Sequence, residues 1–178
     1  MAGEKVERKY LAHFIDAGFN ADPTAAGATF NYIRLGKDLE AFADELNPQI
    51  DIRKNILGEQ NVTHSGYEAQ SSVDVFYAYD GDPLFEQLAL IANERRTGDA
   101  CRTTRVDALF HVSTETATLG QLVCDWAFRE DCWIVPTSVG GDTSGVQIPF
   151  QIYDSGNRVA GTMAQNSTTH KWEFTAST

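Results

Sequence analysis

Cysteine and histidine are scarce in this sequence, and their spacing excludes two common ways of stabilising a small protein. The 178 residues include three cysteines, Cys101, Cys124 and Cys132, with no Cys-x-x-Cys pair, and four widely separated histidines. An odd, dispersed set of cysteines is not a disulfide framework, and a zinc site needs closely spaced Cys or His ligands. We therefore expect reduced thiols and no metal.

Basic residues are also few. The chain has 14 lysines and arginines against 25 acidic residues, which gives a formal net charge of -11. Proteins that wrap DNA or RNA neutralise its phosphates with a basic surface, so this composition excludes tight binding through phosphate contacts. An acidic chain can still lie beside nucleic acid if its role is to avoid sticking, and acidity also confers simple solubility.

Long apolar runs are absent. The first residues, Met1–Lys9, are charged and lack the apolar centre of a secretory signal. No apolar run approaches the length needed to cross a bilayer. We expect a protein that is made in a reducing cytoplasm and has no membrane partner.

Catalytic motifs are missing as well. The sequence contains no Gly-x-Ser-x-Gly nucleophile elbow, and the glycine-rich run Gly140–Gly145 is not followed by the Lys-Ser/Thr pair of a phosphate-binding loop. Asp74, Asp80 and Asp82 lie close in sequence but lack the spacing of a calcium-binding loop. The sequence thus predicts neither an enzyme nor a bound cofactor.

One helix is strongly indicated, at about residues 82–97. Asp82 can cap it, Pro83 suits its first position, and Gly98 suits the left-handed position that stops a helix. One apolar stripe follows helical spacing and is expected to pack on a sheet. Its members are Leu84, Phe85, Leu88 and Ile91.

The rest of the chain has the alternation of strands. Apolar residues repeat with the period of two typical of half-buried strands. These segments are 9–15, 29–35, 50–56, 72–79, 102–118, 122–128, 132–135, 146–152, 158–163 and 171–175. We predict a single mainly β domain over residues 1–178, a β-sandwich or open barrel of antiparallel strands with one flanking helix. Residues 1–28 would supply an N-terminal arm or strand and a linker, and residues 54–71 a long loop between strands.

An ordered set of short segments resembles the phage tail tube (major tail) proteins of phages and prophages of Gram-positive bacteria. The resemblance covers about residues 31–112 well, and the C-terminal hairpin at 147–163 more loosely. It is carried by Tyr32–Leu39, Asn47-Pro48, Lys54–Glu59, Ser65–Glu68, Gly81–Glu86 and Arg95–Asp99.

This resemblance implies a structural virion protein without enzymatic activity. Subunits of the family form hexameric rings that stack into a tube, where they meet the tape-measure protein and other tail proteins. DNA passes through the channel without specific binding, and an acidic wall would repel its phosphates. The protein would be made in the bacterial host cytoplasm and end in the tail of the virion.

The long loop then has a candidate task, which is to bridge one ring to the next. Within residues 55–71, Gly58 and Gly66 would provide bends, and Leu57 and Tyr67 would be apolar anchors, with Asn55 at the start. Two other interpretations stay open. One is a carbohydrate- or receptor-binding β-sandwich with converging exposed aromatic residues; the other is the tube of a contractile tail or a phage-like bacteriocin.

Overall fold

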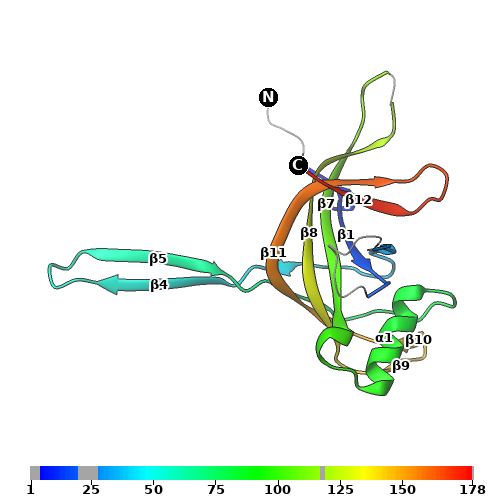
Figure 1. The fold of residues 1–178 in the computed structure, drawn as a ribbon, viewed down its shortest axis with the longest axis horizontal. Helices are drawn as coiled ribbons and strands as arrows, with labels where there is room; N and C mark the ends of the chain where they lie inside the picture. The colour runs from blue at the N-terminus through cyan, green and yellow to red at the C-terminus, as the bar shows by residue number, and fades with distance from the viewer. Residues whose placement is uncertain (1–4, 20–27, 117–118, 178) are drawn as a thin grey trace.

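A computed structural model describes residues 5–19, 28–116 and 119–177 as a mainly β fold with one flanking α-helix, which confirms the predicted fold class (Figure 1). Two short 3-10 helices, η1 (Arg8–Tyr10) and η2 (Gly98–Cys101), accompany the helix α1 (Pro83–Glu94). The strands are β1 (Leu11–Asp16), β2 (Tyr32–Leu35), β3 (Asp44–Glu45), β4 (Pro48–Lys54), β5 (Gln60–Tyr67), β6 (Gln70–Val73), β7 (Arg102–Val112), β8 (Leu122–Pro136), β9 (Gly140–Asp142), β10 (Gly145–Gln147), β11 (Phe150–Gln165) and β12 (Trp172–Ala176).

Six antiparallel strands form a closed circuit. The main sheet runs β12-β2-β1-β7-β8-β11-β6-β3, and β12 pairs a second time, with the C-terminal half of β11. The circuit β2-β1-β7-β8-β11-β12 is therefore a small barrel, whose seam between β12 and β2 is the single residue pair Trp172 and Tyr32. Of the two predicted forms, a β-sandwich or an open barrel, this part of the fold is a barrel, and a single residue pair closes its seam.

The interior of the barrel is apolar and tightly packed. Buried residues from its strands include Phe14, Tyr32, Val106, Phe110 and Met163, and Trp172 packs against them. Close packing also explains one glycine on β11: a Cβ at Gly161 would lie 2.3 Å from the carbonyl oxygen of Thr175 on β12. Only glycine lets the two backbones approach this closely.

β11 belongs to two sheet regions because it bends. Its pairing with β8 is interrupted by an irregularity between Asp154 and Arg158, the local kink that a β-bulge produces. Past this bend, the N-terminal half of β11 pairs with β6, and β6 pairs with β3. The curved course of β11 is visible in Figure 1, where it sweeps from the region of α1 to the barrel end near β12.

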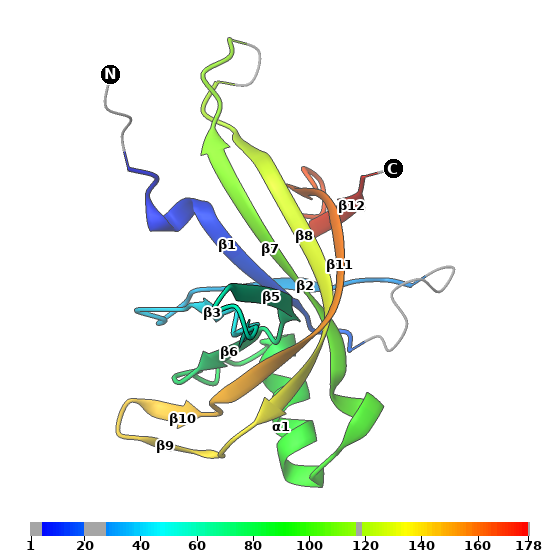
Figure 2. The same cartoon turned by 90° about the vertical axis from the view of Figure 1, so that its left-hand side faces the viewer.

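A second apolar cluster lies where α1 covers this bent part of the sheet (Figure 2). Leu84 and Leu88 of α1 are fully buried there, together with Ile134 of β8 and Phe150 of β11. Asp82 caps the helix as predicted, since its side chain accepts hydrogen bonds from the amides of Leu84 and Phe85.

The predicted C-terminal end of the helix was wrong by about one turn. The helix ends at Glu94, and Arg95 takes the left-handed conformation with φ 52°. The amides of Arg95 and Arg96 then donate to the carbonyls of Ala92 and Ile91, the pattern of a Schellman motif. Gly98, also at positive φ, begins η2 and does not stop the helix.

The prediction of a long loop at residues 54–71 was also wrong. Residues 60–67 form β5, which pairs antiparallel with β4 from Pro48–Tyr67 to Lys54–Gln60, and residues 70–73 form β6. β5 has a single aliphatic side chain, Val62, so it lacks the alternation that reveals a strand by sequence. Its conformation follows from pairing with β4.

The N-terminal segment contributes a central strand. Residues 1–28, expected to give an arm or strand and a linker, contain η1 and β1. β1 pairs with both β2 and β7 and buries residues on both of its faces. The parts of the expected arm and linker at residues 1–4 and 20–27 lie outside the described residues.

Leu88→Asp should unfold the subunit, because it places an unpaired charge at a fully buried position of the second core. Circular dichroism during thermal unfolding should show loss of the cooperative transition. Asn93→Asp, on the exposed side of the same helix, is the matched control and should keep it. A folded Leu88→Asp subunit that fails only in assembly would show that this face of α1 serves a partner.

Candidate functional site: the projecting hairpin and its anchor

The β4–β5 hairpin, called the arm below (residues 48–67), projects far from the barrel (Figure 1). Every residue of β4 is exposed, and β5 is exposed apart from one half-buried position. The register places Ile50 opposite His64 and Ile52 opposite Val62, so these four side chains share one face. Ile50, Ile52 and Val62 are each between 55% and 58% exposed. The arm thus has an apolar face that nothing within the described chain covers.

The tip of the arm is ordered by Asn55. Its Oδ1 accepts hydrogen bonds from the amides of Leu57 and Glu59, both at 3.0 Å, and its Nδ2 donates to Oε2 of Glu59 at 2.7 Å. Gly58 supplies the positive φ of the turn. Ile56 is 103% exposed and Leu57 77% exposed, so a fixed turn presents two aliphatic side chains to solvent.

The five residues expected in the inter-ring loop do not lie together. Asn55, Leu57 and Gly58 form the tip, whereas Gly66 and Tyr67 lie at the base of the arm, opposite Gln49 and Pro48. Tyr67 is 59% exposed and contacts the ring of His64. Sequence reasoning missed the shared apolar face of the arm. Its signal was the alternation of Ile50 and Ile52, which needed the register of β5 to be completed.

The packing face predicted for α1 is buried against the sheet and is not part of the arm. Leu84, Leu88 and Ile91 are buried, and Phe85 is half-buried against the same apolar cluster. This helix therefore supports the sheet region from which the arm departs, at a distance from the arm itself (Figure 1).

A buried arginine joins the base of the arm to the barrel. Arg105 of β7 is 2% exposed, and its Nη2 lies 2.6 Å from Oδ2 of Asp107 and 2.7 Å from Oδ2 of Asp44. Its Nη1 donates to Oγ of Ser71 at 3.0 Å. Asp44 belongs to β3 and Ser71 to β6, the strands directly before and after the arm. The guanidinium therefore holds both roots of the arm to the barrel strand β7.

The same guanidinium faces a third carboxylate, that of Asp154 at the bend of β11. The two charged groups approach to 3.0 Å, yet neither oxygen of Asp154 has a hydrogen-bond partner among the described residues. Burial raises the pKa of Asp154 to about 7; Arg105 opposes the rise, while Glu130, Asp44 and Asp107 add to it. Asp154 is thus the carboxyl of this cluster that takes up a proton near neutral pH.

Arg105 and Asp107 keep their charges. Burial disfavours the charged form of Arg105, but Asp107, Asp154 and Asp44 outweigh it and raise the pKa of the guanidinium above its ordinary value. Burial likewise opposes ionisation of Asp107, but hydrogen bonds and charge from His13 and Arg105 lower the pKa of that carboxyl. The result is a charged Arg105–Asp107 pair with the carboxyl groups of Asp44 and Asp154 beside it.

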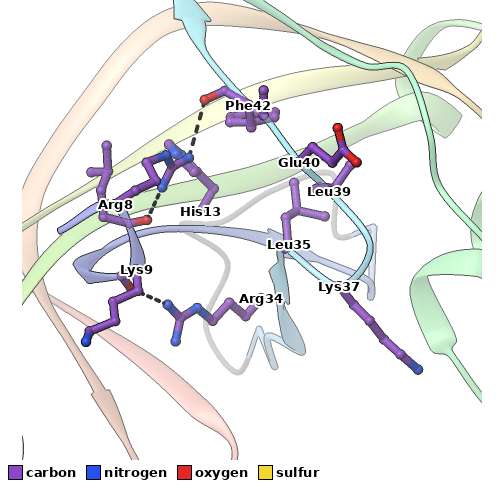
Figure 3. A pocket seen from close by; sticks show the side chains of 12 residues that line it. Arg8, Lys9, His13, Arg34, Leu35, Lys37, Leu39, Glu40 and Phe42 are labelled. Carbon is purple, nitrogen blue, oxygen red and sulfur yellow. Dashed lines mark hydrogen bonds between the residues drawn. The ribbon is translucent and has the colours of Figure 1, made fainter.

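Among the described residues, no group of three or more His, Cys, Asp or Glu side chains is placed to hold a metal ion. Within residues 5–19, 28–116 and 119–177, no helix is both long and apolar enough to cross a membrane. Three features are candidates for a functional role. They are the apolar face of the arm, the ionic anchor (Arg105 with Asp44, Ser71 and Asp107), and a basic pocket that Figure 3 shows from close by.

No protein-family model matches the chain, and no curated protein matches it. Among solved structures, the chain is similar to the cap that terminates the tube of the anti-feeding prophage, determined by cryo-EM. The TM-score is 0.45 at 8% sequence identity, and the match covers 91% of this chain and 94% of that one. At this level of similarity the function of one protein does not transfer to another.

Asp154→Asn should make stability less dependent on pH. The pKa of Asp154 is raised in the folded state, so its contribution is present below about pH 4 and is lost as the pH rises through about 7. Between pH 5 and 8 the variant should gain on the order of 2 kcal/mol relative to the natural chain in urea unfolding. Asp51→Asn, on the exposed arm, is the control and should show a constant difference; the same constancy in Asp154→Asn would contradict the assignment.

Proposed function

We propose that this protein is the tube subunit of a phage or phage-like tail, which self-assembles into stacked hexameric rings. The observation that carries the proposal is the arm, an exposed two-stranded ribbon with an apolar face. The ordered resemblance of residues 31–112 to tail tube proteins supports the same function. In this proposal the protein has no enzymatic activity and works as a building block.

The arm needs a partner for physical reasons. A two-stranded hairpin is at best marginally stable alone in water, and its outer edges offer unpaired backbone groups to another chain. Here the outer edges of β4 and β5 are both open in the described structure, and the ionic anchor fixes the strands at its base. A partner that covers Ile50, Ile52 and Val62 would stabilise the arm and gain apolar contact area.

A further copy of the same chain is a suitable partner. Copies of a chain with net charge -11 repel one another, which disfavours close association. The arm, however, has two acidic residues, Asp51 and Glu59, and two basic ones, Arg53 and Lys54, so it carries no net charge. It is the part of the molecule that can approach a neighbour at the least electrostatic cost.

The acidic composition suits a channel for DNA. A wall of negative potential repels phosphates, so DNA would slide through the tube without specific binding. In this proposal the tape-measure protein and other tail proteins are further partners, and the virion tail is the final location of the protein.

Shortening the arm should abolish assembly and leave the subunit folded. The variant lacks residues 52–62 and joins Asp51 to Thr63, which are opposite each other in the register, through an Asn-Gly turn. Its stability should change by less than about 1 kcal/mol, because the removed side chains are exposed. Negative-stain microscopy of the concentrated natural chain should show rings or tubes, and the shortened chain should give only monomers in sedimentation.

The matched control alters the opposite face of the arm. Arg53→Ala with Asn61→Ala changes a directly paired polar couple and keeps the apolar face, so tubes should persist. Tubes of normal length from the shortened chain would contradict the proposed role of the arm. A natural chain that stays monomeric at high concentration but binds a glycan array would favour a carbohydrate-binding module.

A further inference from the structure

A basic pocket lies between the N-terminal segment and the turn after β2 (Figure 3). It has a volume of about 410 Å³, within the range of sites that hold small ligands. Its lining combines aliphatic and aromatic side chains, among them Leu35, Leu39 and Phe42, with four cations, Arg8, Lys9, Arg34 and Lys37. The pocket is therefore apolar inside and positively charged around it.

Lys9 pairs with Glu7 at 2.8 Å, whereas the other three cations have no ion pair with an acidic side chain among the described residues. Arg8 donates to the carbonyls of Leu11 and Phe42, and Arg34 donates to the carbonyl of Lys9 (Figure 3). Lys37 lies over the ring of Tyr79. Glu40 is the acidic residue in the lining, so the pocket carries a net positive charge in a chain whose total is -11. Such a site attracts an anionic group.

The pocket also contains a buried polar atom with no partner. His13, which lines it, has a side chain 10% exposed and binds Oδ1 of Asp107 through Nδ1 at 2.6 Å. Nε2 is buried and has no hydrogen-bond partner among the described residues. A buried polar atom without a partner costs free energy, and a polar group of an occupant would satisfy it.

Three requirements thus define the occupant: apolar side chains, a carboxylate and a polar group that can hydrogen-bond to Nε2 of His13. A polypeptide segment with adjacent aliphatic and acidic residues meets all three. The tip of the arm has this composition, since Ile56 and Leu57 are exposed on an ordered turn and Glu59 follows two residues later. Strands of seven residues give the arm a reach of about 23 Å, enough to leave its own barrel and meet another.

We propose that this pocket receives the tip of the arm of a second copy of the chain. Ile56 and Leu57 enter the apolar part, and Glu59 pairs with the cations at Arg8, Arg34 and Lys37. The inference rests on the proposed self-assembly and names the surface on the neighbour that the arm reaches. In this proposal the positively charged pocket binds a neighbouring subunit and does not bind a phosphate ligand.

Cross-linking between two variants, each with one engineered surface cysteine, tests this contact. One variant carries Ile56→Cys at the tip, and the other carries Lys37→Cys at the pocket. Both also carry Cys124→Ser, which removes the half-buried native thiol and leaves the two buried ones. Ile56 is fully exposed and Lys37 is exposed, so neither change disturbs the core.

An equal mixture of the two variants, concentrated until natural-type rings or tubes are seen by microscopy, is then oxidised mildly. We expect a reducible dimer at about tenfold higher yield than in a control mixture, because docking raises the local concentration of the two thiols. The control pairs Ile56→Cys with Thr168→Cys, an exposed residue in the turn before β12 and outside the pocket.

The outcomes separate this inference from the proposed function. Rings or tubes with dimer yield no higher than the control would overturn the docking site and leave self-assembly standing. A mixture that never leaves the monomeric state would overturn both. Loss of the dimer on addition of millimolar inorganic phosphate, with specific retention of that ion by the natural chain and not by Lys37→Glu, would instead assign the pocket to phosphate and overturn the docking site.

Discussion

The position of the arm depends on one buried guanidinium. Arg105 binds side chains of the strands on both sides of the arm, at Asp44 and Ser71, and a third on its own barrel strand, at Asp107. Because these contacts lie in a buried region, they are weakly screened by water and salt, unlike ion pairs at the surface. Because both roots of the arm are fixed to one barrel residue, a hairpin that alone would move freely projects in a defined direction.

Charge is distributed unevenly in a way that suits contact between copies. The chain is strongly acidic, but its arm is neutral and its pocket is basic. Contacts between these two regions avoid the repulsion that the rest of the surface generates. The acidic remainder is then free to face solvent or, in the proposed tube, to face DNA. In the proposed assembly, electrostatics therefore favours this mode of association over others.

The parts of the fold that bury one continuous apolar face were predictable from the sequence. The helix, with its cap at Asp82 and stripe through Leu88, and the long strands of the barrel carry their own periodic signal. The helix end was not predictable because Arg95, and not a glycine, takes the left-handed position. β5 was missed because its conformation depends on pairing with β4, and its single aliphatic residue gives no alternation.

The anchor and the pocket lie beyond sequence reasoning for a different reason. Arg105, Asp44 and Asp154 are separated by tens of residues and lie on three strands, so only the register of the folded sheet brings them together. The positive charge of the pocket likewise depends on the fold bringing Arg8 and Arg34 together, where backbone carbonyls hold both side chains. Nothing in the local composition of these segments distinguishes them from solvated surface charges.

The bend in β11 links two distant parts of the molecule mechanically. One end of this strand is hydrogen-bonded to β6, the root of the arm, and the other to β12, whose single pair with β2 closes the barrel. A force applied to the arm is therefore transmitted along the backbone of β11 to the seam between β12 and β2, which is held by one residue pair. Force on the arm and closure of the barrel at the seam are therefore coupled through β11, which bends at Asp154.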